Sequence, residues 1–568
     1  MRDGTRLRAN VFRPDDHEPH PVLLTRLPYG KDLSMASLVL DPLRAAERGY
    51  IVAVQDVRGR FRSEGRFEPF ADEFDDGYDS VEWAARLPGS DGQVAMFGAS
   101  YFGMTQWQAA VERPPHLRAL VPAITWGNFF HGAFRRGGAL EWGLWAGWLM
   151  AAIAPDALMR IHHDNPMDLV TAGWRFAEDL DTMDDRGYWT LPLKDFPSLR
   201  GVVPSFYTQL GLRVDDPFWE RLNVARLWPS IELPTFLLGG WFDVFLGDTL
   251  RAYETFRGRG GPYGPRLLIG PWTHGTFGSL TGDLNFGVSA SGSLINLRED
   301  VTALHLRWFD AVMKNVPGTW PSEAPVQVFV MGENRWRYLP DWPPPDGRAL
   351  VLHLHSRGGA NTAAGDGLLS EVPAVDEVPD RYTYDPNHPV PTRGGALLLA
   401  GRFRPGPVDQ TSVEARPDVL CYTSEPLRAP LTVIGPVSVT LSCSTSAPDT
   451  DFVARLVDVH PDGRAYTLTD GILRLSARDV DWDRPNERQL RPVTPERVYT
   501  VTIDLWATAN TFGAGHRIRL DVTSSSFPRW DRNLNTGESG VNSRTMAVAH
   551  QHVFHDRARP STLHLMTV

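Results

Sequence analysis

The first part of this 568-residue chain alternates short apolar runs with stretches of helical periodicity. Residues 7–11 alternate apolar and polar side chains, which predicts a half-buried strand near the start. More continuous apolar runs, typical of buried strands, follow at residues 21–27, 50–54, 94–97 and 117–124. Helical patterns lie between some of these runs, around residues 38–48 and 77–87. The alternation predicts a mostly parallel sheet flanked by helices.

A tryptophan-rich segment then interrupts this pattern. Residues 126–230 are irregular and helical in places, and three tryptophans there have the spacing of one helix face: Trp142, Trp145 and Trp148. Sheet-like apolar runs and a final helix return afterwards, at residues 233–240, 266–270 and 300–314. We therefore predict an α/β domain formed by residues 1–125 and 231–320. Residues 126–230 are expected to be a helical cap inserted at the carboxyl edge of its sheet.

From residue 324 onwards the chain consists of short alternating runs separated by glycine, proline and aspartate turns. Such runs lie at residues 326–330, 431–434, 437–441, 499–505 and 517–522. Many short strands without intervening helices predict an all-β sandwich, of the jelly-roll kind, over residues 324–568. The chain is thus expected to join an α/β domain, a helical cap and a C-terminal jelly roll.

Composition excludes several functional classes. The formal net charge is −11 and the basic residues are scattered, so no nucleic-acid footprint is visible. The only two cysteines, Cys421 and Cys443, argue against a disulfide framework and suit a reducing compartment. The first residues form no apolar signal region, and no apolar run reaches the roughly 18 residues of a membrane span, so we expect a cytoplasmic protein. Zinc motifs such as C-x-x-C and H-E-x-x-H do not occur, and no metal is expected.

The segment Gly98-Ala99-Ser100-Tyr101-Phe102-Gly103 carries the strongest chemical signal. It joins an apolar run to helix-forming residues, as the nucleophile elbow of a serine hydrolase does. The spacing G-x-S-x-x-G departs by one residue from the usual G-x-S-x-G. It keeps a small residue two positions before the serine, which a sharp strand-to-helix turn requires. Glycine and serine are common in loops, so this motif needs partners elsewhere in the chain.

Two later residues supply these partners in the chain order of α/β hydrolases, which is serine, acid, histidine. Asp243 and His274 each directly follow a predicted strand, where open α/β sheets bind their ligands. Taken alone, Asp243 could be a helix N-cap and His274 a turn histidine. Their order after the elbow favours a catalytic triad, in which a histidine takes the proton of Ser100 and a carboxylate orients that histidine.

Charged residues near the second predicted helix are interpreted as structural. Arg58 lies in a glycine-containing loop and is expected to be buried in salt bridges rather than to bind an anion. The acidic run at residues 72–79 is expected to be the solvated start of a helix, where negative charge is favourable, and not a metal site.

The ordered motifs together resemble the cocaine esterase and Xaa-Pro dipeptidyl-peptidase family of serine hydrolases. Besides the elbow, Asp243 and His274, the resemblance rests on Met1-Arg2-Asp3-Gly4, on Arg26-Leu27-Pro28-Tyr29-Gly30-Lys31, and on residues 56–60, 384–386, 391–395 and 529–537. The family combines an α/β-hydrolase domain, a helical cap and a C-terminal jelly roll. The resemblance implies that Ser100 is the nucleophile, His274 the general base and acid, and Asp243 its orienting partner.

The same resemblance assigns the oxyanion hole to the Tyr29 hydroxyl and the backbone N–H of Tyr101. From the sequence alone, Tyr29 could equally pack on the end of the sheet. No cofactor is implied. The implied reaction is acyl transfer from a small-molecule ester or amide to water, without a nucleic-acid or membrane partner. The oligomeric state is left open, with a homodimer among the options.

The substrate pocket is less closely defined. In the related α-amino acid ester hydrolases, carboxylates two and three positions after the catalytic aspartate bind the substrate ammonium. Here these positions are Phe245 and Leu246, which disfavours aminoacyl esters and resembles the cocaine esterase type. Trp142, Trp145 and Trp148 are candidates to line the pocket, although aromatics at helical spacing more often pack in a core.

Three functional alternatives remain from the sequence. The main one is a serine esterase with Ser100 as the acylated residue. A second is an Xaa-Pro dipeptidyl-peptidase or an acylase that cleaves amides. A third, of another class, is a binding protein in which the jelly roll recognises a ligand and the hydrolase domain is inactive.

Overall fold

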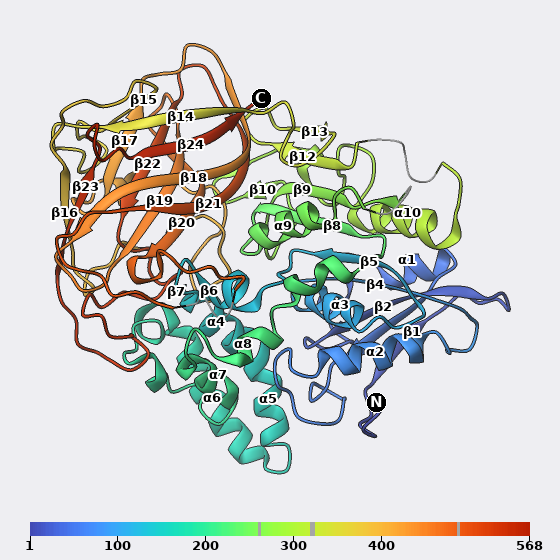
Figure 1. Ribbon diagram of the computed structural model, residues 1–568. Helices are drawn as coiled ribbons and strands as arrows, with labels where there is room; N and C mark the ends of the chain where they lie inside the picture. Colours follow the sequence, from blue (N-terminus) through green and yellow to red (C-terminus); the bar gives the residue numbers. More distant parts are fainter. Residues whose placement is uncertain (260–262, 319–323, 485–488) are drawn as a thin grey trace.

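A computed structural model describes residues 1–259, 263–318, 324–484 and 489–568, and contains two large sheets (Figure 1). The first sheet has nine strands in the order β1-β3-β2-β4-β5-β8-β9-β12-β13. Their bounds are β1 Ala9–Phe12, β2 His20–Leu27, β3 Ile51–Asp56, β4 Ser90–Ala99, β5 Leu117–Ala123, β8 Phe236–Phe242, β9 Arg266–Thr273, β12 Val326–Val330 and β13 Arg335–Leu339. In this order, the neighbouring strands from β3 to β12 pair in parallel. The two edge strands, β1 and β13, pair antiparallel with β3 and β12.

Helices cover both faces of this sheet. One face carries α2 (Glu73–Ala84), α3 (Tyr101–Val111) and α9 (Leu246–Phe256). Of these, α3 and α9 pack through Trp107 and Phe256, whose ring centroids are 5.6 Å apart. The other carries α1 (Pro42–Glu47) and α10 (Val301–Lys314), joined by Arg48 and Tyr50, which both bond Asp310. With helices on both faces, the central strands β2, β3, β8 and β9 are buried along nearly their whole length, which explains their continuous apolar runs. This α/β architecture matches the sequence-based prediction.

The predicted helix over residues 38–48 is shorter than expected. The structure has a short 3-10 turn at Ser34–Ser37, and α1 begins only at Pro42. Asp41 caps α1 by accepting a hydrogen bond from the Leu43 N–H at 2.9 Å. A proline at the first helical position disfavours helical geometry in the residue before it, so the apolar pattern of 38–41 cannot continue the helix.

The segment between β5 and β8 forms a lobe of helices below the sheet's carboxyl edge (Figure 1). Its helices are α4 Trp142–Trp148, α5 Ala154–Ile161, α6 Pro166–Asp181, α7 Pro204–Gly211 and α8 Pro217–Arg221. In the described part of the chain, no helix is both long and apolar enough to cross a bilayer.

The C-terminal part is β-rich, as expected, and forms a mixed sheet of eleven strands (Figure 1). The strands are β14 Arg348–His355, β15 Leu368–Ser370, β16 Asp380–Tyr384, β17 Leu420–Ser424, β18 Leu431–Thr445, β19 Asp451–Val459, β20 Ala465–Arg474, β21 Tyr499–Phe512, β22 Arg517–Thr523, β23 Ala549–Phe554 and β24 Thr562–Thr567. The two runs predicted at 431–434 and 437–441 belong to one long strand, β18. Both cysteines are free and buried in this part of the molecule.

One strand assigned to the C-terminal sandwich belongs to the first sheet instead. Strand β12 pairs in parallel with β9, with Val326 opposite Leu267, and then turns back into β13. Residues 326–339, expected to lie in the C-terminal sandwich, therefore contribute their strands to the first sheet. Alternation with a period of two marks any strand with one exposed face, and it does not say which sheet the strand joins.

The motif at residues 529–537 fastens the C-terminal part to the cap. The Trp530 indole donates to Glu141 Oε1 at 2.8 Å, and the backbone N–H of Leu140 donates to Asp531 at 2.7 Å. Arg529, the residue before Trp530, donates a hydrogen bond to Asp470 of β20 at 2.5 Å. These groups are buried, so each needs its partner to offset the loss of water. The motif thus sets how the cap meets the β-rich part.

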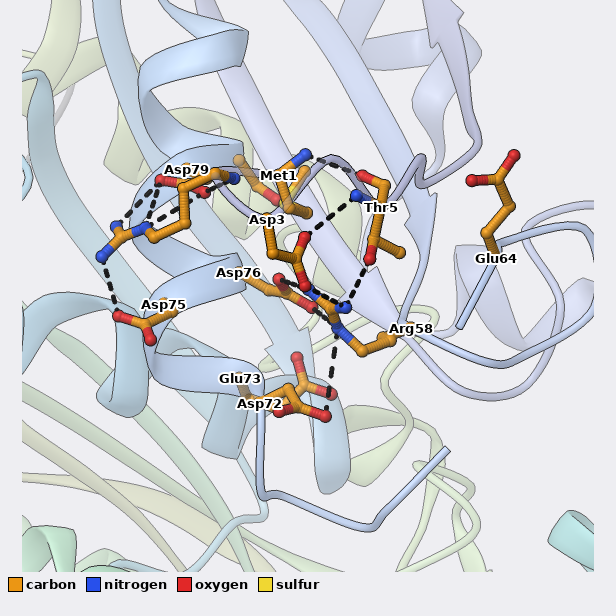
Figure 2. A network of polar contacts seen from close by, with 12 residues as sticks. Met1, Asp3, Thr5, Arg58, Glu64, Asp72, Glu73, Asp75, Asp76 and Asp79 are labelled. Atoms are coloured by element: carbon orange, nitrogen blue, oxygen red, sulfur yellow. Dashed lines mark hydrogen bonds and ion pairs between the residues drawn. The ribbon is translucent and has the colours of Figure 1, made fainter. Parts of the chain in front are cut away.

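Charged side chains near the N-terminus hold the first residues against α2, as Figure 2 shows. Arg58 bonds Asp3 at 2.7 Å and Asp76 at 2.6 Å, and its side chain is only 16% exposed. Arg2 pairs with Asp75 and Asp79 at 2.9 and 2.8 Å. Arg58 thus lies in salt bridges as predicted, and most of the acidic run is neutralised by two arginines rather than simply solvated.

Candidate active site

Ser100 lies in a strained turn between β4 and α3, at the carboxyl edge of the sheet. Its backbone angles are φ 57° and ψ −122°, in a region that side chains other than glycine rarely occupy. Gly98 is required nearby, since it has φ 140° and an added Cβ would lie 2.2 Å from the Phe102 ring. Gly103 faces Thr125, whose side chain would lie 2.7 Å from an added Cβ. The extra residue in G-x-S-x-x-G therefore places its last glycine where α3 packs closely on the next loop.

The three residues predicted as a triad meet in space. His274 Nε2 lies 2.9 Å from Ser100 Oγ, and His274 Nδ1 lies 2.6 Å from Asp243 Oδ1. Asp243 and His274 directly follow β8 and β9, so the parallel sheet brings both residues to the edge where Ser100 lies. With Asp243 accepting from Nδ1–H, the lone pair of Nε2 faces the Ser100 hydroxyl.

Burial strengthens this arrangement. Asp243 is fully buried and His274 is 6% exposed. The second carboxylate oxygen of Asp243 is buried without a hydrogen-bond partner among the described residues. Protonated His274 is therefore the main group that can stabilise this charge, and low dielectric strengthens the attraction. The edge of the Phe245 ring contacts the imidazole at 5.0 Å between centroids, which fixes the ring's orientation.

The Tyr29 hydroxyl lies beside the serine. It lines the same cavity as Ser100 and accepts the indole N–H of Trp148 at 3.0 Å. Burial raises the pKa of Tyr29 to about 12, so the phenol stays protonated at neutral pH. Because an indole nitrogen only donates, the hydrogen of Tyr29 remains available for another acceptor at the site. Sequence analysis did not find this role of Trp148.

Tyr101 contributes its backbone on one side and an anchored side chain on the other. It is the first residue of α3, so its N–H has no acceptor within the helix and lies next to Ser100. Its hydroxyl donates to Glu73 Oε1 at 2.9 Å, and Glu73 in turn pairs with Arg26 at 2.8 Å. Burial raises the pKa of Glu73, and this residue is therefore an exception to the solvated acidic run. The buried network holds the start of α3 in place below the elbow.

An apolar cavity of about 220 Å³ opens beside Ser100 and His274. The cap contributes Trp148 and small residues such as Gly147 and Ala151, and the sheet side contributes Tyr29 and Ile124. The remaining lining residues, which the sequence did not indicate, are Met35, Leu38, Phe102, Ala152, Gly275, Leu398, Leu399 and Ala400. The apolar run at 396–400, inside an otherwise polar loop region, was the available signal for the last three.

A second, smaller cavity beside Ser100 is walled by aromatic rings. Trp145, Trp148 and Phe245 line it, together with Trp126 and Phe70. Three of the four candidate pocket residues therefore lie at the site.

Trp142 does not reach these cavities. Its indole donates to the Tyr188 carbonyl at 2.9 Å and stacks on Phe206 in the cap core. Residues six apart along a helix diverge by about 120° at 3.6 residues per turn, so Trp142 and Trp148 turn to different neighbours.

The chain is similar to known proteins over nearly its whole length. A family model described as X-Pro dipeptidyl-peptidase (S15 family) matches residues 3–276, and one described as X-Pro dipeptidyl-peptidase C-terminal non-catalytic domain matches residues 319–564. Cocaine esterase of Rhodococcus sp. (strain MB1 Bresler) is 37% identical over 543 residues, which cover 94% of this chain and 91% of that protein. A putative serine esterase of Mycobacterium bovis is 26% identical, with 92% of this chain and 89% of that protein covered.

Among solved structures, an α-amino acid ester hydrolase superimposes with a TM-score of 0.79 at 25% identity, covering 100% of this chain and 95% of that one. A CocE/NonD family hydrolase from Staphylococcus aureus, at 18% identity and a TM-score of 0.69, shares the fold. The relatives match both the α/β part and the β-rich part of the chain. The chain belongs to the cocaine esterase and X-Pro dipeptidyl-peptidase (S15) family of serine hydrolases.

Proposed function

We propose that the protein is a serine esterase that cleaves carboxylic esters through an acyl-enzyme on Ser100. The observation that carries this proposal is the apolar cavity that opens at Ser100 beside a hydrogen-bonded His274–Asp243 pair. A serine hydroxyl becomes a nucleophile only when a base takes its proton, and the 2.9 Å contact with Nε2 supplies that base. The cavity adds space for an apolar group next to the reacting atom.

Acylation follows from these contacts. Ser100 Oγ attacks the ester carbonyl carbon while its proton moves to His274 Nε2, and Asp243 stabilises the imidazolium. The carbonyl oxygen becomes an oxyanion that accepts hydrogen bonds from the Tyr29 hydroxyl and the Tyr101 N–H. His274 then gives its proton to the leaving alcohol, and the acyl group remains on Ser100.

Deacylation repeats these steps with water in place of the serine. His274 takes a proton from a water molecule as the water oxygen attacks the acyl carbonyl. The same two donors hold the second oxyanion. When it collapses, His274 returns the proton to Ser100 Oγ and a carboxylic acid leaves. The proposed chemistry uses side chains and backbone groups of this chain throughout.

The lining of the cavity indicates an uncharged acyl group. Apart from Ser100, Tyr29 and His274, its side chains are aliphatic or aromatic. Phe245 and the fully buried Leu246 occupy the positions at which α-amino acid ester hydrolases are expected to carry carboxylates. An ammonium group would therefore lose its water without gaining an anionic partner, which is unfavourable.

We further propose a division of the chain into functional parts. Residues 1–125 and 231–320, extended by β12 and β13, form the catalytic domain. The cap at 126–230 supplies aromatic walls to the site. The β-rich part, from β14 onwards, is proposed to be a jelly roll that closes the cavity with residues 398–400.

The substrate class can be tested with a panel of model substrates. We expect kcat/KM for p-nitrophenyl esters of uncharged acyl groups to exceed that for matched aminoacyl esters by about 10²-fold, the effect of one unpaired charged group. Xaa-Pro anilides should be cleaved more slowly still. A preference for Xaa-Pro anilides would favour the dipeptidyl-peptidase alternative, and a preference for simple amides would favour an acylase.

The role of Tyr29 predicts a separate effect. Tyr29→Phe should lower kcat by about 10²–10³ with little change in KM, as expected for the loss of one oxyanion donor. Tyr50→Phe is the matched control, because it removes a buried hydroxyl bonded to Asp310, away from Ser100. Steady-state kinetics of both variants separate the two cases. A Tyr29→Phe enzyme with unchanged kcat would remove Tyr29 from the oxyanion hole.

A further inference from the structure

Three side chains with metal-binding atoms meet at the end of the β-rich part that faces the first sheet. Asp458 lies near the end of β19, His460 in the turn between β19 and β20, and His516 in the turn between β21 and β22. His516 Nδ1 is 2.8 Å from Asp458 Oδ1, and His460 Nε2 is 3.7 Å from Asp458 Oδ2. The centroids of the two imidazole rings are 4.3 Å apart. The β19–β20 hairpin turn and the turn between β21 and β22 thus bring two imidazoles towards one carboxylate.

The distances among these atoms suit a small cation. One ligand atom from each residue can be chosen so that all three lie within 4.8 Å of one another. In a tetrahedral zinc site with bonds of about 2.0–2.1 Å, neighbouring ligand atoms are about 3.3 Å apart. The separations among the three atoms therefore need to shorten by at most about 1.5 Å to surround one ion. His460 and His516 are on turns and their side chains are 26% and 20% exposed, so small adjustments are accessible.

A cavity of about 440 Å³ adjoins the cluster. Asp458, His460 and His516 line it together with Tyr466 of β20. Its opposite wall comes from the first sheet and includes Asn334 in the turn between β12 and β13. Three protein ligands beside such a space leave a coordination position for water or for a donor atom of a small ligand.

The surroundings favour a cation over a simple ion pair. Asn510 donates to Asp458 Oδ2 at 3.3 Å and fixes the carboxylate, as second-shell groups do at metal sites. Arg464, the cation that acts on His460, is itself paired with Asp462 at 2.8 Å.

We propose that Asp458, His460 and His516 form a binding site for a divalent transition metal, with Zn²⁺ as the expected ion. Two imidazole nitrogens and one carboxylate oxygen suit zinc, whereas Mg²⁺ and Ca²⁺ prefer oxygen ligands. The bound ion would join the β19–β20 hairpin to the turn between β21 and β22, where both meet the first sheet. The site is separate from Ser100 and does not depend on the esterase proposal.

Metal binding to the full-length protein tests this proposal. Metal-free protein titrated with Zn²⁺ in a calorimeter should bind one ion per chain at this site, and Co²⁺ should give the visible absorption of a nitrogen-ligated ion. His460→Ala and His516→Ala should each weaken Zn²⁺ binding by about 10²-fold or more, at least the loss seen when even a second-shell partner is removed. Mg²⁺ should bind far more weakly than Zn²⁺.

His388→Ala is the matched control, because His388 is an exposed histidine paired with Asp385 at 3.0 Å elsewhere in the β-rich part. It should bind Zn²⁺ as the unchanged protein does. Asp458→Asn provides a second variant in which both histidines remain, and its affinity should also fall. Hydrolysis of a p-nitrophenyl ester by the variants checks that they are folded.

No Zn²⁺ binding, or equal affinity in the His460→Ala, His516→Ala and His388→Ala proteins, would overturn the proposal. The cluster would then be a hydrogen-bonded Asp458–His516 pair only. Equal affinity for Zn²⁺ and Mg²⁺ would also contradict it, since such binding would come from scattered carboxylates rather than from two imidazoles.

Discussion

The substitution Ser100→Ala is expected to lower kcat for a p-nitrophenyl ester by about 10⁶, the usual loss when a triad nucleophile is removed. Alanine retains the backbone and most of the volume of serine, so the elbow and the cavity should stay intact. Without Oγ, no acyl-enzyme forms, and only direct attack by water remains. Steady-state kinetics measure the loss, and the melting temperature of the variant reports on its fold.

Ser37→Ala is a suitable control for this experiment. Ser37 is exposed, and it lies in the short turn before α1 that contributes Met35 and Leu38 to the cavity's surroundings. Its replacement should leave kcat unchanged. A Ser100→Ala protein that retained most of its kcat would show that another group carries the reaction.

A second large effect is expected at Asp243. The substitution Asp243→Asn should lower kcat by about 10⁴, because an amide at this position no longer holds His274 in the tautomer with Nε2 free. The 2.6 Å contact from Nδ1 to Oδ1 is the geometry on which this expectation depends. The substrate cavity is lined by other residues, so KM should change little.

Asp164→Asn serves as the charge-matched control, since that carboxylate is 88% exposed and lies in the cap. It should retain full activity. An Asp243→Asn protein with normal kcat would contradict the proposed role of Asp243. A parallel loss of kcat and of thermal stability would instead indicate a structural role for this buried carboxylate.

Much of the catalytic geometry could be predicted from local sequence. Buried parallel strands give continuous apolar runs, and the chemistry of an open α/β sheet lies directly after their carboxyl ends. Asp243 and His274 follow two such runs, and Ser100 follows a third. The position directly after a predicted strand was therefore enough to identify Ser100, Asp243 and His274, which are far apart in the chain and meet in the structure.

Features that depend on contacts between distant segments could not be predicted in this way. An alternating pattern fits either sheet for β12, and only its pairing with β9 decides between them. The acidic run at the start of α2 gave no sign that Glu73 turns inward to bond Tyr101 and Arg26. Similarly, helical spacing could not show that Trp148 reaches Tyr29 while Trp142 packs within the cap.

The proposed metal site illustrates the same limit. Its histidines lie in two different turns, between β19 and β20 and between β21 and β22, so no short motif such as C-x-x-C or H-E-x-x-H marks them. Only the pairing of β19 with β20 and β22 brings Asp458 and the two turns together. Metal ligands that lie in separate turns can be recognised only in the folded structure.

Ser100 is proposed to be the residue that is acylated during turnover. Reaction with a fluorophosphonate probe, followed by mass spectrometry of the labelled peptides, tests this role of Ser100. We predict one probe adduct per active chain, located on Ser100, with labelling abolished in Ser100→Ala and strongly slowed in Asp243→Asn. An adduct on another residue, undiminished labelling of Ser100→Ala, or no labelling of the intact protein would contradict the account.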